Sequence, residues 1–125
     1  MPDQENVAPA VATVPELSAE VGSSLASVWA RYVGARPSKA ETQLEGSVVR
    51  WQLAEGTREF EEGMSVASEE DGSPRPERTM AGYKRETAAA VAKVTHRRVV
   101  AMMSDHDSKT GIATETFILE GPRKY

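Results

Sequence analysis

The chain has 125 residues, 39% of them apolar, and carries a formal net charge of −4. This length corresponds to one domain with a single hydrophobic core, which we expect over residues 16–121 between flexible tails at 1–15 and 122–125. Cysteine is absent, which excludes disulfides, thiolate metal sites and cysteine nucleophiles. No uncharged run approaches the roughly 18 residues of a membrane span. Because the acidic start does not resemble a secretory signal, we expect a cytoplasmic protein without a transmembrane segment of its own.

The first predicted helix begins at Leu17 and ends near Tyr32. Its apolar residues recur at steps of three and four, the period of an amphipathic helix with one buried stripe. Gly34 is suited to cap the end of this helix, and Pro37 prevents the helix from continuing. We interpret Trp29, on the apolar stripe, as a core residue.

A hairpin is predicted after this helix. Val49, Trp51 and Leu53 alternate with polar residues, as in a strand with one buried face. The turn at residues 45–47 contains a glycine and predicts a hairpin whose first strand has the weaker pattern. A short helix beginning near Gly56 is expected to follow.

The second long helix is expected after a loop at residues 68–75, with Pro76 in its first turn, where the missing N–H has little cost. The side opposite its apolar face is basic and contains Arg78, Arg85 and Lys93. The predicted apolar face consists of Met80, Tyr83, Thr87, Ala90, Val91 and Val94.

The last third of the chain predicts a second hairpin. Residues 99–103 form a continuous apolar run, typical of an interior strand, and the segment 104–111 is rich in turn formers. Residues 112–119 are expected to return as the next strand. We therefore predict an α+β fold made of a doubled helix–hairpin unit, with a four-stranded antiparallel sheet and the two long helices packed on one of its faces.

Four segments carry a resemblance to a known family: Gly34 to Ala40 after the first helix, Arg97 to Ala101, Ser104-Asp105, and Phe117 to Glu120. In these motifs, and over roughly residues 18–120, the chain resembles the MpsC-like family of small bacterial proteins. The family name refers to a sodium-translocating system that generates membrane potential and has also been linked to uptake of inorganic carbon. The resemblance brings no established active site with it.

The resemblance implies a non-catalytic accessory or regulatory domain that acts through protein contacts with a membrane cation or inorganic-carbon transport system. The residues show no catalytic, metal or nucleotide-binding motif and no glycine-rich phosphate loop. We accordingly expect no enzyme activity and no cofactor. A homodimer formed through free sheet edges is compatible with the sequence, although nothing in the sequence specifies it.

An alternative from the residues themselves is a small-anion or nucleotide sensor. Arg36 and Lys39 follow the first long helix, and Arg97 and Arg98 follow the second, so both pairs lie at helix-to-strand junctions. If the two units are arranged alike, these cations could converge on phosphate, carboxylate or bicarbonate. The competing interpretation is that they are solvated charges at strand ends, which limit edge-to-edge pairing.

Two other groups of residues favour structural roles. The segment 104–107, Ser-Asp-His-Asp, and nearby His96 are candidate metal ligands or triad members. Neighbours in a strand point to opposite faces, so we predict instead a turn stabilised by Asp side chains and a helix-end role for His96. The basic helix side at Arg78, Arg85 and Lys93 is interpreted as a solvated surface, because the pI of 5.2 argues against nucleic acid.

Overall fold

The computed structural model describes residues 13–70 and 79–121. Residues 1–12 of the predicted tail at 1–15 lie outside the described residues, as do the predicted tail at 122–125, residues 71–75 of the predicted loop and Pro76. Val14 and Pro15, which were also predicted to belong to the tail, lie in the first turn of α2. The described elements are α2 (Val14–Val33), β1 (Ala40–Glu45), β2 (Val48–Leu53), α3 (Gly56–Glu70), α4 (Met80–Thr95), β3 (Val99–His106) and β4 (Ala113–Leu119). They confirm the predicted α+β fold.

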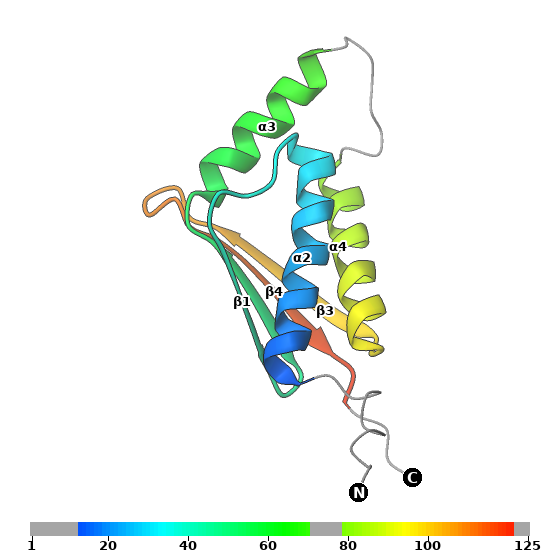
Figure 1. Ribbon diagram of the computed structural model, residues 1–125. Coiled ribbons are helices and arrows are strands. Elements are labelled where there is room, and N and C mark those ends of the chain that lie inside the picture. Colours follow the sequence, from blue (N-terminus) through cyan, green and yellow to red (C-terminus); the bar gives the residue numbers. More distant parts are fainter. Residues whose placement is uncertain (1–12, 71–78, 122–125) are drawn as a thin grey trace, which may run out of the picture.

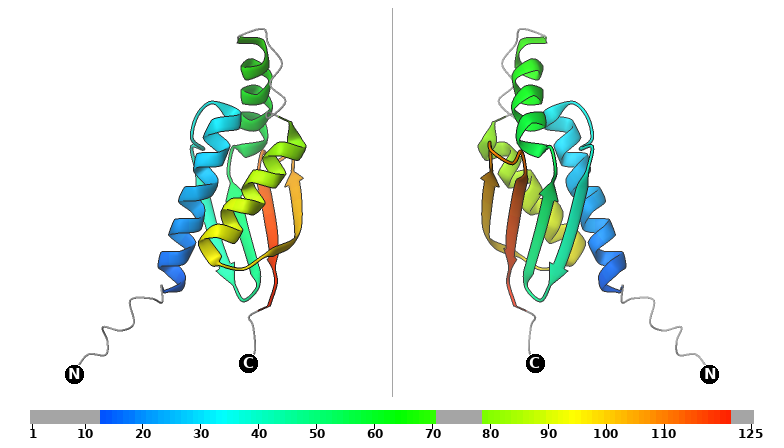
Figure 2. Two further views of the ribbon diagram at one scale, coloured as in Figure 1. Left: turned by 90° about the vertical axis from the view of Figure 1, so that its right-hand side faces the viewer. Right: turned by 90° about the vertical axis from the view of Figure 1, so that its left-hand side faces the viewer.

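The four strands form one antiparallel sheet in the order β1-β2-β4-β3. The two strands of each hairpin pair with each other, β1 with β2 and β3 with β4. Strand β2 also pairs with β4, which joins the two hairpins at the centre of the sheet. Helices α2 and α4 pack against each other across one face, and α3 projects beyond one end of the sheet (Figure 1). None of the described segments covers the opposite face (Figure 2). We call these the inner and the outer face.

Local capping determines where α2 begins and ends. Thr13 and Glu16 form a capping box, in which each side chain accepts a hydrogen bond from the other residue's backbone N–H. The helix begins at Val14, three residues before the apolar pattern, because Pro15 lies in the first turn, where no N–H is needed. Gly34 ends the helix in a left-handed conformation with φ of 99°, as predicted.

The core lies between the inner face and the two long helices. Its centre is aromatic: the rings of Trp29 and Trp51 meet edge to face at 5.8 Å, and Tyr83 packs against both Trp29 and Phe60. Edge-to-face pairs add to the stability that burial provides. The predicted core positions of Trp29, Trp51 and Tyr83 are confirmed, since all three are fully buried.

Helix α3 is longer than the sequence predicted and includes the first residues of the segment 68–75 that was assigned to a loop. Gly63 lies in this helix although glycine disfavours helical structure. A Cβ atom there would come within 2.4 Å of a Val33 side-chain carbon. Gly63 therefore permits α3 to pass close to the end of α2, which a larger residue would prevent.

The prediction that residues 99–103 form an interior strand was wrong. Strand β3 is at the edge of the sheet, and β4 has the interior position. A bulge at Val100 shifts the register, and the side chains of Val100 and Met103 are 54% and 55% exposed. The run is apolar on both faces, but only the inner face has helices to cover it, so its outer residues remain accessible.

Helix α4 confirms most of its predicted apolar face. Tyr83, Thr87 and Val91 are buried, whereas Met80 at the start of the helix is 40% exposed. His96 ends the helix in a left-handed conformation with φ of 59°, and its backbone N–H donates to the preceding turn. The predicted helix-end role of His96 is thus confirmed.

Candidate functional site

The structure separates the four cations that the sequence suggested as an anion site. Arg36 and Lys39 lie beside the start of β1, where Ala40 pairs with Leu53. Arg97 and Arg98 precede β3, which begins opposite the last residues of β4. The register places these two points at opposite ends of the sheet, about 20 Å apart for strands of six residues. The four side chains therefore do not converge on one ligand.

Arg97 is a structural residue in this arrangement. Its guanidinium group donates to the carbonyl oxygens of Glu120 (2.9 Å) and Gly46 (3.1 Å) and to the Ser47 hydroxyl (2.7 Å). These contacts connect the entry to β3 with the end of β4 and the β1–β2 turn. Three donors of the guanidinium are thus engaged in holding strand ends together, as its forked geometry allows.

The other three predicted cations are more exposed. Arg98 forms an ion pair with Glu120 at 3.5 Å, and its side chain is 74% exposed. Lys39 lines a shallow hollow of about 470 Å³ near Ile112, and Arg36 lines a larger groove beside α2. On the basic side of α4, Arg85 and Lys93 are exposed as predicted, while Arg78 lies outside the described residues.

The segment 104–107 is a strand end followed by a turn. The Asp107 carboxylate accepts a hydrogen bond from the backbone N–H of Lys109 at 2.9 Å, which confirms the predicted turn stabilised by an Asp side chain. That bond lowers the pKa of Asp107 below its usual value. His106 points to the inner face, and within residues 13–70 and 79–121 no three His, Asp or Glu side chains are grouped as metal ligands.

A buried polar cluster occupies the inner face, and the sequence analysis missed its central residue. Glu115 is fully buried and accepts a hydrogen bond from the Tyr83 hydroxyl at 3.1 Å. Its other carboxylate oxygen lies 3.3 Å from His106 Nε2. Burial, followed by the charge of Glu115 and the hydrogen bond to it, raises the pKa of Tyr83 well above the usual value. This cluster fixes α4 to the sheet.

A sequence signal for Glu115 did exist. Strand β4 alternates, and its inner positions are Ala113, Glu115, Phe117 and Leu119. An acidic residue among three apolar ones on a buried face requires a partner, because an unpaired buried carboxylate is very costly. The partners come from α4 and β3, so their identity was not evident from the strand alone.

A second polar cluster joins the helices at the molecular surface. Glu86 of α4 accepts a hydrogen bond from the Tyr32 hydroxyl at 2.8 Å and forms an ion pair with Arg31 of α2. The hydrogen bonds from Arg31 and Tyr32 lower the pKa of Glu86, whose side chain is 35% exposed. Burial and the bond to Glu86 raise the pKa of Tyr32 to about 12.

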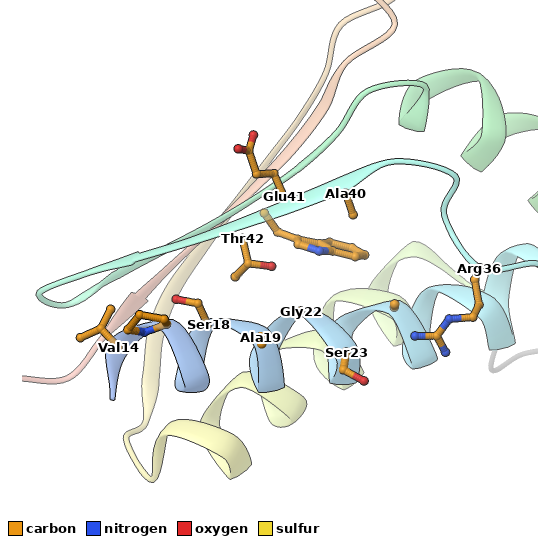
Figure 3. Close-up of a pocket in the computed structure, with 12 residues that line it drawn as sticks. Val14, Ser18, Ala19, Gly22, Ser23, Arg36, Ala40, Glu41 and Thr42 are labelled. Atoms are coloured by element: carbon orange, nitrogen blue, oxygen red, sulfur yellow. The ribbon is translucent and has the colours of Figure 1, made fainter. Parts of the chain in front are cut away.

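A groove of about 740 Å³ runs between α2 and the edge strand β1. Small residues line it from the helix, including Ala19, Gly22 and Ser23 (Figure 3). A Cβ atom at Gly22 would lie 2.5 Å from the Thr42 hydroxyl, so glycine permits the helix to approach the strand closely. Figure 3 shows the Glu41 side chain directed away from α2.

The wall of this groove includes a hydrogen-bond donor that has no acceptor. Trp51 lines the groove and is fully buried, and its indole N–H has no partner among the described residues. The same is true of the Trp29 indole N–H and the Ser104 hydroxyl, which do not line it. At the far end, Arg36 has no ion-pair partner in the part of the chain that the structure describes.

The outer face carries an apolar patch. Val48, Ile118 and Ala101 are neighbours across β2, β4 and β3 in the register, on the side opposite the core. Met103 lies in the next row, and Val100 lies in the bulge beside them. We call these five residues the outer patch. Val100 and Met103, which are 54% and 55% exposed, belong to the edge strand β3, where they are accessible to another protein.

No known protein family, no curated protein and no solved structure matches this chain. In the described residues no helix has the length and apolarity needed to cross a membrane. The structure therefore defines the chain as a small α+β protein whose described helices cover one face of an antiparallel sheet. Its candidate binding surfaces are the groove beside α2 and the outer patch.

Proposed function

We propose that this protein is a cytoplasmic, non-catalytic accessory or regulatory domain that binds a protein of a membrane cation or inorganic-carbon transport system. The proposal rests on the resemblance to the MpsC-like family and on the outer patch. Val100 and Met103 are each more than half exposed. Exposed apolar patches that adjoin polar surface are typical of protein interaction sites.

The surroundings of the outer patch support a protein partner. Arg50 and Thr116 lie in the same row of the sheet as Met103, next to the row that contains Val48 and Ile118. Polar side chains therefore adjoin the apolar ones on this side of the outer patch. Apolar residues bordered by polar ones are the usual composition of a protein–protein interface. The buried cluster around Glu115, by contrast, holds α4 on the sheet and serves stability.

The geometry gives less support to the alternative of a small-anion sensor. That prediction depended on the convergence of all four cations, whereas Arg97 is engaged with strand ends and Arg36 lies at the other end of the sheet. A basic nucleic-acid surface is also not favoured, because Arg85 and Lys93 belong to a chain with a net charge of −4.

Affinity purification from native membranes in mild detergent tests the proposal. The wild-type protein should recover a component of a cation or inorganic-carbon transporter. The double variant Val100→Asp, Met103→Asp should recover at least about tenfold less, since a charge in the centre of an interface costs more than 1.4 kcal/mol. The matched control is Ala89→Asp on the exposed side of α4, which should recover the wild-type amount.

Failure to recover any transport component with the wild-type protein contradicts the proposal. Equal recovery with the double variant and the control removes the outer patch as the contact surface. Far-ultraviolet circular dichroism of both variants checks that the fold is retained, which is expected because the substituted side chains are exposed.

A further inference from the structure

The edge strand β1 has backbone groups at defined positions that pair with no other group in residues 13–70 and 79–121. The Ala54 N–H donates to the Lys39 carbonyl, so residues 39 and 54 form a hydrogen-bonded pair. Antiparallel ladders alternate such pairs with non-bonded ones. The backbone groups of Ala40, Thr42 and Leu44 therefore face away from β2. Because β1 ends the sheet, these groups form a free edge to which another strand can bind.

The groove beside α2 is suited to the side chains of such an added strand. Inner-face side chains of a strand next to β1 would project between β1 and α2, into the groove of about 740 Å³. Ala19 and Ser23 are small and exposed, so α2 leaves this space open.

The charge of β1 limits which strand fits. Glu41 and Glu45 lie on the outer face of β1 and are exposed. Residues directly opposite each other in a sheet attract if their charges differ and repel if they are alike. A second copy of β1 would bring these glutamates near those of its partner, whereas lysine or arginine at the outward positions would be favoured.

We propose that the β1 edge is a docking site for an extended segment of a partner protein, in which apolar side chains directed into the groove alternate with basic ones opposite Glu41 and Glu45. The segment becomes a fifth strand. Main-chain hydrogen bonds to Thr42 and Leu44 provide affinity, and the groove and the two carboxylates provide selectivity. This site is separate from the outer patch, so the docking proposal can be tested independently of the proposed transport partner.

A synthetic peptide of about seven residues with alternating lysine and valine, blocked at both ends, serves as the probe. Added to the full chain, it should slow amide hydrogen exchange at Thr42 and Leu44, since their N–H groups become hydrogen-bonded. The amides of β4, already paired on both sides, report on global stability and should change far less. The control peptide has glutamate in place of lysine and should have no effect at the same concentration.

Two sets of variants test the groove and the charges separately. Ser23→Leu fills the groove and should weaken binding of the lysine peptide at least about tenfold. Ser27→Leu, one turn further along α2 and outside the groove, should leave binding unchanged. The double variant Glu41→Lys, Glu45→Lys should no longer bind the lysine peptide and should bind the glutamate peptide instead. The control variant Glu20→Lys on α2 should bind the lysine peptide as the wild type does and should not bind the glutamate peptide.

Three outcomes would overturn the proposal. The first is no slowing of exchange at Thr42 and Leu44 at millimolar peptide. The second is equal weakening by Ser23→Leu and Ser27→Leu, since the groove would then have no specific part. The third is slowing that rises with protein concentration in the absence of peptide, which would identify a second copy of the chain as the occupant.

Discussion

Inside the molecule Tyr83 donates a hydrogen bond to Glu115, and at the surface between α2 and α4 Tyr32 donates one to Glu86. In both clusters the other carboxylate oxygen meets a basic side chain, a histidine in the first and an arginine in the second. The groups are chemically alike. They differ in exposure, since Glu115 is fully buried and the Glu86 side chain is 35% exposed.

This difference determines what each cluster contributes. Water can replace a lost partner of Glu86, so the surface contacts are worth little individually. Glu115 has no exposed surface, so removal of one of its partners leaves a desolvated polar group. Helix α4 is therefore held by a strong polar attachment to the sheet through Tyr83 and by a weak, adjustable one to α2 through Glu86.

The largest expected effect is that of Glu115→Ala. It leaves the buried Tyr83 hydroxyl without its acceptor and creates a cavity, and these two effects together should cost about 3–5 kcal/mol. Glu115→Gln, which keeps the shape and an acceptor for Tyr83, should cost clearly less. The free energy of unfolding from urea denaturation measures both. A loss no greater than that of Glu86→Ala would contradict the contrast between the two clusters.

Removal of single tyrosine hydroxyls should give the next largest difference. Tyr83→Phe leaves a Glu115 oxygen without its donor in the interior and should cost about 1–3 kcal/mol. Tyr32→Phe exposes the Glu86 oxygen to water and should cost less than about 1 kcal/mol. Thermal unfolding of the two variants under identical conditions provides the comparison. Equal losses would show that burial is not the deciding factor.

The dependence of stability on pH should reveal the surface cluster. Because the pKa of Glu86 is lowered on folding, its ionised form stabilises the protein above the usual value of 4.5, and this contribution is lost as pH falls through the folded-state pKa. Glu86→Gln should lose less stability over that acidic range, as measured by urea denaturation at a series of pH values.

A separate effect is expected at alkaline pH. The stability that Tyr32 contributes is complete below pH 10 and disappears as the pH rises through about 12, where the pKa of the folded state lies. The free energy of unfolding of Tyr32→Phe should therefore fall less over this range than that of the wild type.

The smallest predicted contrast lies between two adjacent arginines. Arg97→Ala removes three hydrogen bonds that join strand ends and should cost about 1–2 kcal/mol. Arg98→Ala removes one exposed ion pair and should cost less than about 0.5 kcal/mol. Urea midpoints of the two variants decide this. A similar loss for both would assign Arg97 to the same solvated role as Arg98.

The elements of the fold could be predicted where local chemistry determines them. Gly34 and the β1–β2 turn were identified from residues whose conformation depends on near neighbours in the chain. Helix α2 begins three residues before the predicted start at Leu17, because Thr13 caps it and Pro15 is its second residue, which the spacing of apolar residues does not reveal. Strand β3 lies at the edge of the sheet rather than in the interior position that its apolar run predicted, because such a run does not indicate whether a strand will have neighbours on both sides.

The candidate sites show the same limit. The pair Arg97 and Arg98 was selected as one unit, yet their side chains have different surroundings. Glu115 was overlooked because its partners, Tyr83 and His106, belong to other elements. A groove between a helix and an edge strand cannot be inferred before the distance between those elements is known.

The sequence by itself determined the helices, the hairpins and the absence of cysteine chemistry, because periodicity, capping and composition act over a few residues. Only the tertiary structure decided that β4 is central and β3 peripheral, that none of the described helices covers the outer face of the sheet, and which polar side chains meet in the core. Those properties depend on which surfaces pack together, and packing joins residues such as Tyr83 and Glu115 that are 32 positions apart.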